Sequence, residues 1–247
     1  VRYNSGQKEI FINSGNFYSG VLLENYSKIT HFYRLSGIAD SMANENARLR
    51  AELRFATIDA SFRHDSLIDT VYRQRYSFIS AQVVSNSVNQ IDNFITINKG
   101  SDFGVKPGMG VINNAGVVGI VRQTSRNYAT VASLLGSQTK ISAAIKRNGY
   151  FGSLVWDNTS TEYVYLTDIP KHADILKGDS VITSGYSTTF PRGIYIGRVE
   201  NVGFDPGSSF YDLKVKLTTD FNNLTYVYVI LDKTKPQLDS LNNAILR

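Results

Sequence analysis

The most informative absence in this chain of 247 residues is cysteine, of which there is none. Without thiols the chain forms no disulfide and offers no thiolate ligand for zinc. Histidine is scarce, and His31, His64 and His172 do not stand in the spacing of a metal motif such as HExxH. We therefore expect no metal site and no cofactor.

The sequence also lacks the patterns of membrane-spanning, nucleotide-binding and nucleic-acid-binding proteins. No apolar run approaches the roughly 20 residues that a membrane-spanning helix needs. No P-loop, dinucleotide fingerprint or paired-carboxylate motif stands out. The net charge is +5, but the basic residues are scattered rather than gathered around stacking aromatics, so we expect no nucleic-acid binding.

The segment from about 20 to 60 contains no proline and has the composition of a helix. Within it, apolar residues recur alternately three and four positions apart, which is typical of the a/d seam of a coiled coil. The predicted seam consists of Phe32, Leu35, Ala39, Met42, Asn46, Leu49 and Leu53. A single Asn at an a position favours a parallel two-stranded coil. The alternative interpretation is one amphipathic helix packed on its own domain.

From Tyr76 onward the pattern becomes that of a β-protein. About twelve short apolar runs, rich in β-branched and aromatic residues, are separated by Gly, Asn, Asp, Ser or Pro. An internal repeat organises the region: residues 106–112 match 176–182, and each match is followed by a strand that begins with glycine. The pattern predicts two duplicated barrels of about six strands each, because closing a barrel removes exposed edges.

One string resembles catalytic chemistry. Gly178, Asp179 and Ser180 echo the turn around the nucleophile of trypsin-like proteases. Their repeat partner has no serine, and no suitable His–Asp pair stands with them. A tight turn before a strand explains the string equally well, so we expect no enzyme activity.

Several motifs together resemble the MreC family. Residues 98–109 and 116–121 are similar to the first family signature, and 177–185 with 190–197 to the second. Glu45, Asn46 and Leu49 are similar to the end of the family's coiled coil. The likeness covers about residues 20 to 232 in the expected order.

The resemblance implies a non-enzymatic scaffold for bacterial cell shape. Family members have a short cytoplasmic N-terminus, one membrane-spanning helix, a coiled coil and two β-barrels of trypsin-like topology without a catalytic triad. They self-associate and link MreB and MreD to the class B penicillin-binding transpeptidase and its partner RodA. By resemblance, we expect a homodimer that positions or activates this transpeptidase at the extracytoplasmic face of the inner membrane, anchored by a helix upstream of Val1.

The resemblance also implies that the second barrel is inserted in the first, although the sequence alone does not distinguish insertion from succession. The predicted parts are an N-terminal segment with the helix (1–77), a first barrel (78–122 plus 198–232), a second barrel (123–197) and a C-terminal tail (233–247).

A glycine-bracketed loop is the candidate partner-binding loop. Gly185 and Gly193 enclose Tyr186 and Phe190. In one interpretation the loop is a tight turn whose Phe190 folds back on the core. In the other, Tyr186 or Phe190 is an exposed anchor for a partner. Alternative functions are a peptidoglycan- or glycan-binding β-module and a degenerate trypsin-like protease.

Overall fold

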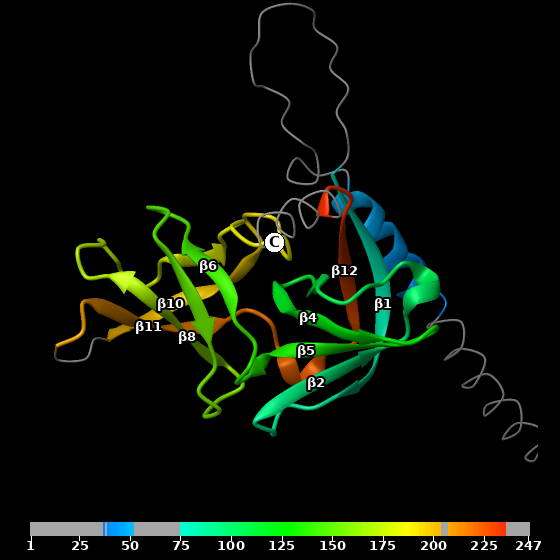
Figure 1. The fold of residues 1–247 in the computed structure, drawn as a ribbon, viewed down its shortest axis with the longest axis horizontal. Helices are drawn as coiled ribbons and strands as arrows, with labels where there is room; N and C mark the ends of the chain where they lie inside the picture. The colour runs from blue at the N-terminus through cyan, green and yellow to red at the C-terminus, as the bar shows by residue number, and fades with distance from the viewer. Residues whose placement is uncertain (1–36, 38, 52–74, 204–206, 236–247) are drawn as a thin grey trace, which may run out of the picture. The chain divides into compact units, whose positions relative to one another are not determined.

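The computed structural model describes residues 37, 39–51, 75–203 and 207–235 (Figure 1). Contacts divide the chain into two compact units, 1–45 and 46–247. Residues 37 and 39–51 are helical, and the remaining described residues are mainly strands. None of the described helical segments is long and apolar enough to cross a membrane.

Each short apolar run expected from the sequence lies in a strand. The strands are β1 Tyr76–Asn86, β2 Asp92–Ile97, β3 Gly110–Ile112, β4 Val117–Thr124, β5 Ala129–Gly136, β6 Ile141–Ile145, β7 Phe151–Val155, β8 Tyr163–Pro170, β9 Ser180–Thr183, β10 Tyr195–Gly203, β11 Phe210–Leu217 and β12 Tyr226–Asp232. In the part of the chain that the structure describes, two single-turn 3-10 helices, η2 Ser101–Phe103 and η3 Phe221–Asn223, lie in the loops.

The strands close into two six-stranded barrels, which confirms the predicted fold class. The order around the first barrel is β1-β12-β3-β4-β5-β2, and around the second it is β10-β11-β8-β7-β6-β9. Every pairing within both barrels is antiparallel. Closure gives each strand two hydrogen-bonded neighbours, so neither barrel presents a free sheet edge.

The barrel boundaries differ from those predicted. The sequence predicts 78–122 plus 198–232 for the first barrel and 123–197 for the second. In the structure β5 pairs with β2 and β4 and completes the first barrel, whereas β10 and β11 belong to the second. Only β12 returns to the first barrel, where it pairs with β1 and β3. Local sequence does not reveal which distant strand an apolar run pairs with.

The internal repeat corresponds to the same hydrogen-bonded turn in each barrel. Gly108 precedes β3 with φ 81°, and Gly178 precedes β9 with φ 91°, a region that glycine adopts without steric cost. The Gly108 N–H donates to Val121 O over 2.8 Å, and the Gly178 N–H donates to Val199 O over 2.7 Å. The repeat thus marks equivalent strand pairs, β3–β4 and β9–β10.

A second glycine of the repeat allows close strand approach. A Cβ on Gly119 in β4 would lie 2.2 Å from Ala132 O, and one on Gly197 in β10 would lie 2.1 Å from Lys216 O. Both distances are shorter than any side chain tolerates, so the neighbouring strand would have to move. These glycines are required by packing within the barrels.

The helix has two different faces. Ala43, Ala47 and Ala51, four residues apart, are buried. Ala47 and Ala51 belong to the same apolar cluster as the barrel core, and the Arg50 guanidinium lies 4.8 Å from the centre of the Tyr228 ring of β12. Small residues therefore hold residues 46–51 of the helix close to the first barrel.

Candidate functional site: a groove on the second barrel and an exposed helix face

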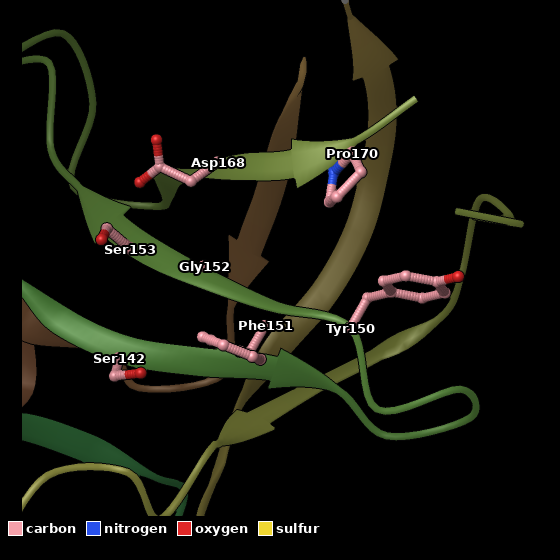
Figure 2. Close-up of a pocket in the computed structure, with 7 residues that line it drawn as sticks. All are labelled: Ser142, Tyr150, Phe151, Gly152, Ser153, Asp168 and Pro170. Atoms are coloured by element: carbon pink, nitrogen blue, oxygen red, sulfur yellow. The ribbon is translucent and has the colours of Figure 1, made fainter. Parts of the chain in front are cut away.

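A groove of about 330 Å³ crosses the outer surface of the second barrel (Figure 2). Three neighbouring strands, β6, β7 and β8, supply most of its walls. Its lining residues are Ser142, Tyr150, Phe151, Gly152, Ser153, Asp168 and Pro170. Figure 2 shows Ser142, Ser153 and Asp168 toward one end and Tyr150 and Pro170 toward the other, so the groove has a polar end and an apolar end.

The polar end arises from strand register. Ser142 of β6 pairs with Ser153 of β7, which pairs in turn with Thr167 of β8. Cross-strand partners lie about 5 Å apart and share a face of the sheet. Three hydroxyl side chains therefore form a row across three strands, and Ser184 extends it with a 2.7 Å hydrogen bond to Ser142 Oγ.

Asp168 stands at an irregular point beside this row. The register between β8 and β11 shifts here, and Asp168 has φ 66°, which is uncommon for a residue other than glycine. Its side chain is exposed, and among the described residues its carboxylate receives one hydrogen bond, from Thr167 Oγ1 at 3.3 Å. The bulge thus turns a carboxylate with unused acceptor capacity toward solvent.

Aromatic side chains border the groove. Phe151 is 52% exposed and Tyr186 is 73% exposed. Their ring centres lie 4.7 Å apart, within the range of a favourable aromatic pair. Tyr150 makes an edge contact with His172 at 5.6 Å. Exposed aromatic pairs of this kind are common in binding surfaces because they bury area at low entropic cost.

In the candidate partner-binding loop, one aromatic residue is exposed and the other is buried. Tyr186 is exposed, but Phe190 is only 3% exposed and so is not an exposed anchor. A Cβ on Gly110 of β3 would lie 2.6 Å from the Phe190 ring, so this ring packs directly on the glycine backbone. Of the two predicted residues, only Tyr186 has the exposure that a partner-binding anchor needs.

The predicted seam is described only in part. Phe32, Leu35 and Leu53 lie outside the described residues, while Ala39 is partly buried and Asn46 is exposed. Met42 is 61% exposed and Leu49 is 48% exposed, on the side of the helix away from the buried alanines. The larger apolar residues of the predicted seam therefore reach solvent in the single chain.

The protease-like string is a turn. The Asp179 N–H donates to Leu176 O over 3.1 Å, and the Leu176 N–H donates back to the Asp179 carboxylate over 3.0 Å. Arg147 binds the same carboxylate with two hydrogen bonds of 3.0 Å. The hydrogen bonds from Arg147 hold the pKa of Asp179 below its usual range. Asp179 thus orders the turn before β9, as the alternative interpretation of this string expected.

Within the described ranges, no three His, Cys, Asp or Glu side chains gather as a metal site would require. His172 contacts Tyr150 on the surface. Sequence reasoning missed the groove, although alternation along β6 and β7 placed Ser142 and Ser153 on one outward face. Nothing in the local sequence indicated that these two strands are neighbours of β8, or that Asp168 has a positive φ.

This fold defines a class of two-barrel β-proteins in which a helix precedes the barrels in sequence. The chain belongs to the MreC family. Residues 83–231, more than half of the chain, match the family model described as "Rod shape-determining protein MreC, barrel core".

Relatives support this assignment. The cell shape-determining protein MreC of Listeria monocytogenes is 32% identical over 183 residues, which cover 68% of this chain and 62% of that protein. The chain thus spans less than two thirds of this relative. A solved structure of MreC from Listeria monocytogenes has 28% identity and a TM-score of 0.60, covering 88% of this chain and 96% of that one. A Helicobacter pylori structure, described as a complex between penicillin-binding protein PBP2 and MreC, shares the fold with a TM-score of 0.52 and 17% identity.

Proposed function

We propose that this protein is a non-enzymatic scaffold for bacterial cell shape, which binds and positions or activates a class B penicillin-binding transpeptidase. The observation that carries the proposal is the family match, which extends through both barrels from residue 83 to 231. The relatives at this level of similarity are named cell shape-determining proteins. A scaffold acts by binding, and the exposed features of this chain are suited to binding rather than to chemistry.

A transpeptidase partner is supported by the complex of the Helicobacter pylori relative with its PBP2. On this chain we propose Tyr186 as a contact residue, because it is the exposed aromatic of the candidate loop. Its packing against Phe151 orders the ring before binding, which lowers the entropic cost of association.

Self-association is proposed to run through the helix. The exposed Met42 and Leu49, with Asn46 between them, would form the seam of a parallel two-stranded coil. The alanine face explains how the same helix also contacts the first barrel, since the two contacts use opposite sides. The two interpretations of the helix are therefore compatible.

Family membership further supports a location at the extracytoplasmic face of the inner membrane. Structures of a related MreC describe its major periplasmic domain. We propose that an N-terminal membrane-spanning helix anchors the protein, that MreD and RodA belong to the same complex, and that the cytoplasmic part reaches MreB.

Binding to the class B transpeptidase of the same organism tests the proposal. The purified chain should bind the purified transpeptidase in surface plasmon resonance, and Tyr186→Ala should weaken binding by about tenfold or more. Tyr128→Ala is the matched control, because Tyr128 is a 50% exposed tyrosine that follows β4 in the first barrel. Absence of saturable binding by the unmodified chain would reject the transpeptidase as a direct partner.

The non-enzymatic part of the proposal has its own test. Ser180→Ala should restore rod shape in cells depleted of the protein as well as the unmodified chain does. A folded Ser180→Ala variant that lost a measured hydrolytic activity would show that the protein is an enzyme instead.

A further inference from the structure

We infer that the groove on the second barrel binds an uncharged, hydroxyl-rich saccharide. This inference goes beyond the proposed function, because neither transpeptidase binding nor self-association requires a ligand in the groove. It rests on three features of the groove, which are its row of hydroxyls, its aromatic wall and the carboxylate of Asp168.

The hydroxyl row matches the spacing of saccharide polar groups. The side chains of Ser142 and Ser153 line the groove at the strand separation of about 5 Å, and Thr167, the partner of Ser153 on β8, lies next to this pair. A hydroxyl both donates and accepts a hydrogen bond. Ser142 Oγ already accepts one from Ser184, and Thr167 Oγ1 already donates to Ser153 O. Ser153 Oγ has no hydrogen-bond partner among the described residues, which leaves both capacities for a ligand.

The aromatic wall matches the apolar face of a sugar ring. Pyranose rings expose C–H groups on one side, and these pack on the electron-rich face of an aromatic ring. Phe151 lies beside the hydroxyl row, two positions from Ser153 on the same outward face of β7, and it is half exposed. Tyr150 and Pro170 continue the apolar surface toward the other end of the groove (Figure 2). One groove thus offers stacking and hydrogen bonding side by side.

Asp168 adds a strong acceptor. A carboxylate accepts hydrogen bonds from hydroxyl or amide N–H groups of a sugar, and these bonds are stronger than neutral ones. An aspartate at φ 66° is conformationally costly, and a glycine there would avoid that cost. Its presence in the groove wall agrees with a role in binding.

Charge and topology select the class of ligand. Among the described residues, the lining of the groove includes one carboxylate and no lysine or arginine. The groove therefore disfavours phosphate-rich or carboxylate-rich chains. An extended peptide that bound by adding a strand would need a free sheet edge, and the closed second barrel presents none. A neutral saccharide requires neither a cation nor an edge.

The test is a titration of the ¹⁵N-labelled full chain with the N-acetylglucosamine tetramer. We expect saturable amide shifts at Ser142, Phe151, Ser153 and Asp168 with a dissociation constant below about 10 mM. Phe151→Ala should weaken binding about fivefold or more, and Ser153→Leu should block the hydroxyl row. Asp168→Gly should weaken binding without backbone strain, because glycine accepts the same φ.

Controls separate this inference from the proposed function. Tyr128→Ala, on the first barrel, should bind the tetramer like the unmodified chain. Ser153→Leu should leave binding to the transpeptidase unchanged, because the proposed transpeptidase contact is Tyr186 and not the hydroxyl row. The melting temperature of each variant checks that it folds. The inference is overturned by no saturable shift up to about 10 mM, by shifts confined to the first barrel, or by displacement of the tetramer by polyphosphate.

Discussion

At the scale of single residues, Phe190 and Gly110 illustrate how a loop can be part of a core. The ring occupies the place that a side chain on Gly110 would need, so the two residues constrain each other. Because Phe190 is 3% exposed, its loss leaves a cavity that the backbone of β3 cannot fill.

The first prediction follows from this packing. Phe190→Ala should lower the free energy of unfolding by about 3 kcal/mol or more, whereas Tyr186→Ala should change it by less than about 0.5 kcal/mol. Chemical denaturation of both variants, with constant m values, measures the difference. Equal stabilities would mean that the ring contributes nothing to the core.

The second prediction concerns Arg75 and Asp232, which flank the contact between β1 and β12. Burial opposes ionisation of Asp232, but hydrogen bonds from Arg75 and Thr234 prevail and hold the pKa of its carboxyl below its usual value. Because the pKa is lowered in the folded state, the pair stabilises the protein above the unfolded pKa of about 4 and loses this effect as the pH falls further.

Asp232→Asn should therefore cost about 1 to 2 kcal/mol at pH 7 and much less at pH 3. Melting temperatures of the two proteins between these pH values measure the effect. A difference that stayed constant across the range would assign the cost to lost packing rather than to the ion pair.

At the scale of elements, the helix has two faces that differ in the size of their apolar residues. Ala47 and Ala51 pack with the core of the first barrel, and the larger Met42 and Leu49 lie on the other side of the helix. An amphipathic helix with one apolar stripe would have only one such face.

The third prediction is that Leu49→Asp combined with Leu53→Asp converts the protein to a monomer in analytical ultracentrifugation, because charges in an apolar seam are not solvated. Asn44→Asp provides a matched control, since it adds a charge at an exposed position outside the predicted seam. A monomeric mass for the unmodified chain at about 100 µM would exclude the dimer.

At the scale of the whole molecule, the two barrels have the same strand order, but one strand of each comes from a different position in the sequence. Five consecutive strands, β1 to β5, build the first barrel, and β12 from the end of the chain closes it. In the second barrel, β7 to β11 take the places of β1 to β5. The remaining strand, β6, precedes them in sequence and takes the place of β12. All six strands of the second barrel are thus contiguous in sequence, whereas the first closes only after the second has been made.

The fourth prediction follows from this difference. Residues 137–219 alone should fold cooperatively, because they contain every strand of the second barrel. A chain that ends at residue 219 should lose the first barrel, since β1 and β3 would be left with unpaired edges. Amide dispersion in NMR spectra distinguishes these outcomes, and a chain that ends at 235 is the control. An intact first barrel in the shorter chain would contradict the required closure by β12.

The connection between the barrels is held by hydrogen bonds to both of them. Thr218 Oγ1 lies 3.1 Å from Ala115 O in the first barrel and 3.0 Å from Ile196 O in the second. The next residue, Thr219, bonds Val117 O and Asn113 Oδ1 within the first barrel. Short hydroxyl contacts therefore fix the chain where it leaves the second barrel.

The sequence by itself determined the elements of this protein. Alternation and turn residues located the strands, because side chains of period two and glycines of positive φ are local properties. The repeat around Gly108 and Gly178 identified equivalent turns for the same reason. Family motifs then indicated the class of protein.

Only the tertiary structure decided which strands pair, and hence the barrel boundaries and the groove. β5 and β11 are both strands of eight residues, yet β5 belongs to the first barrel and β11 to the second. Phe190 and Tyr186 are both aromatic residues of one loop, but packing against Gly110 buries the first and leaves the second exposed. These outcomes depend on contacts between residues far apart in sequence, which no local pattern encodes.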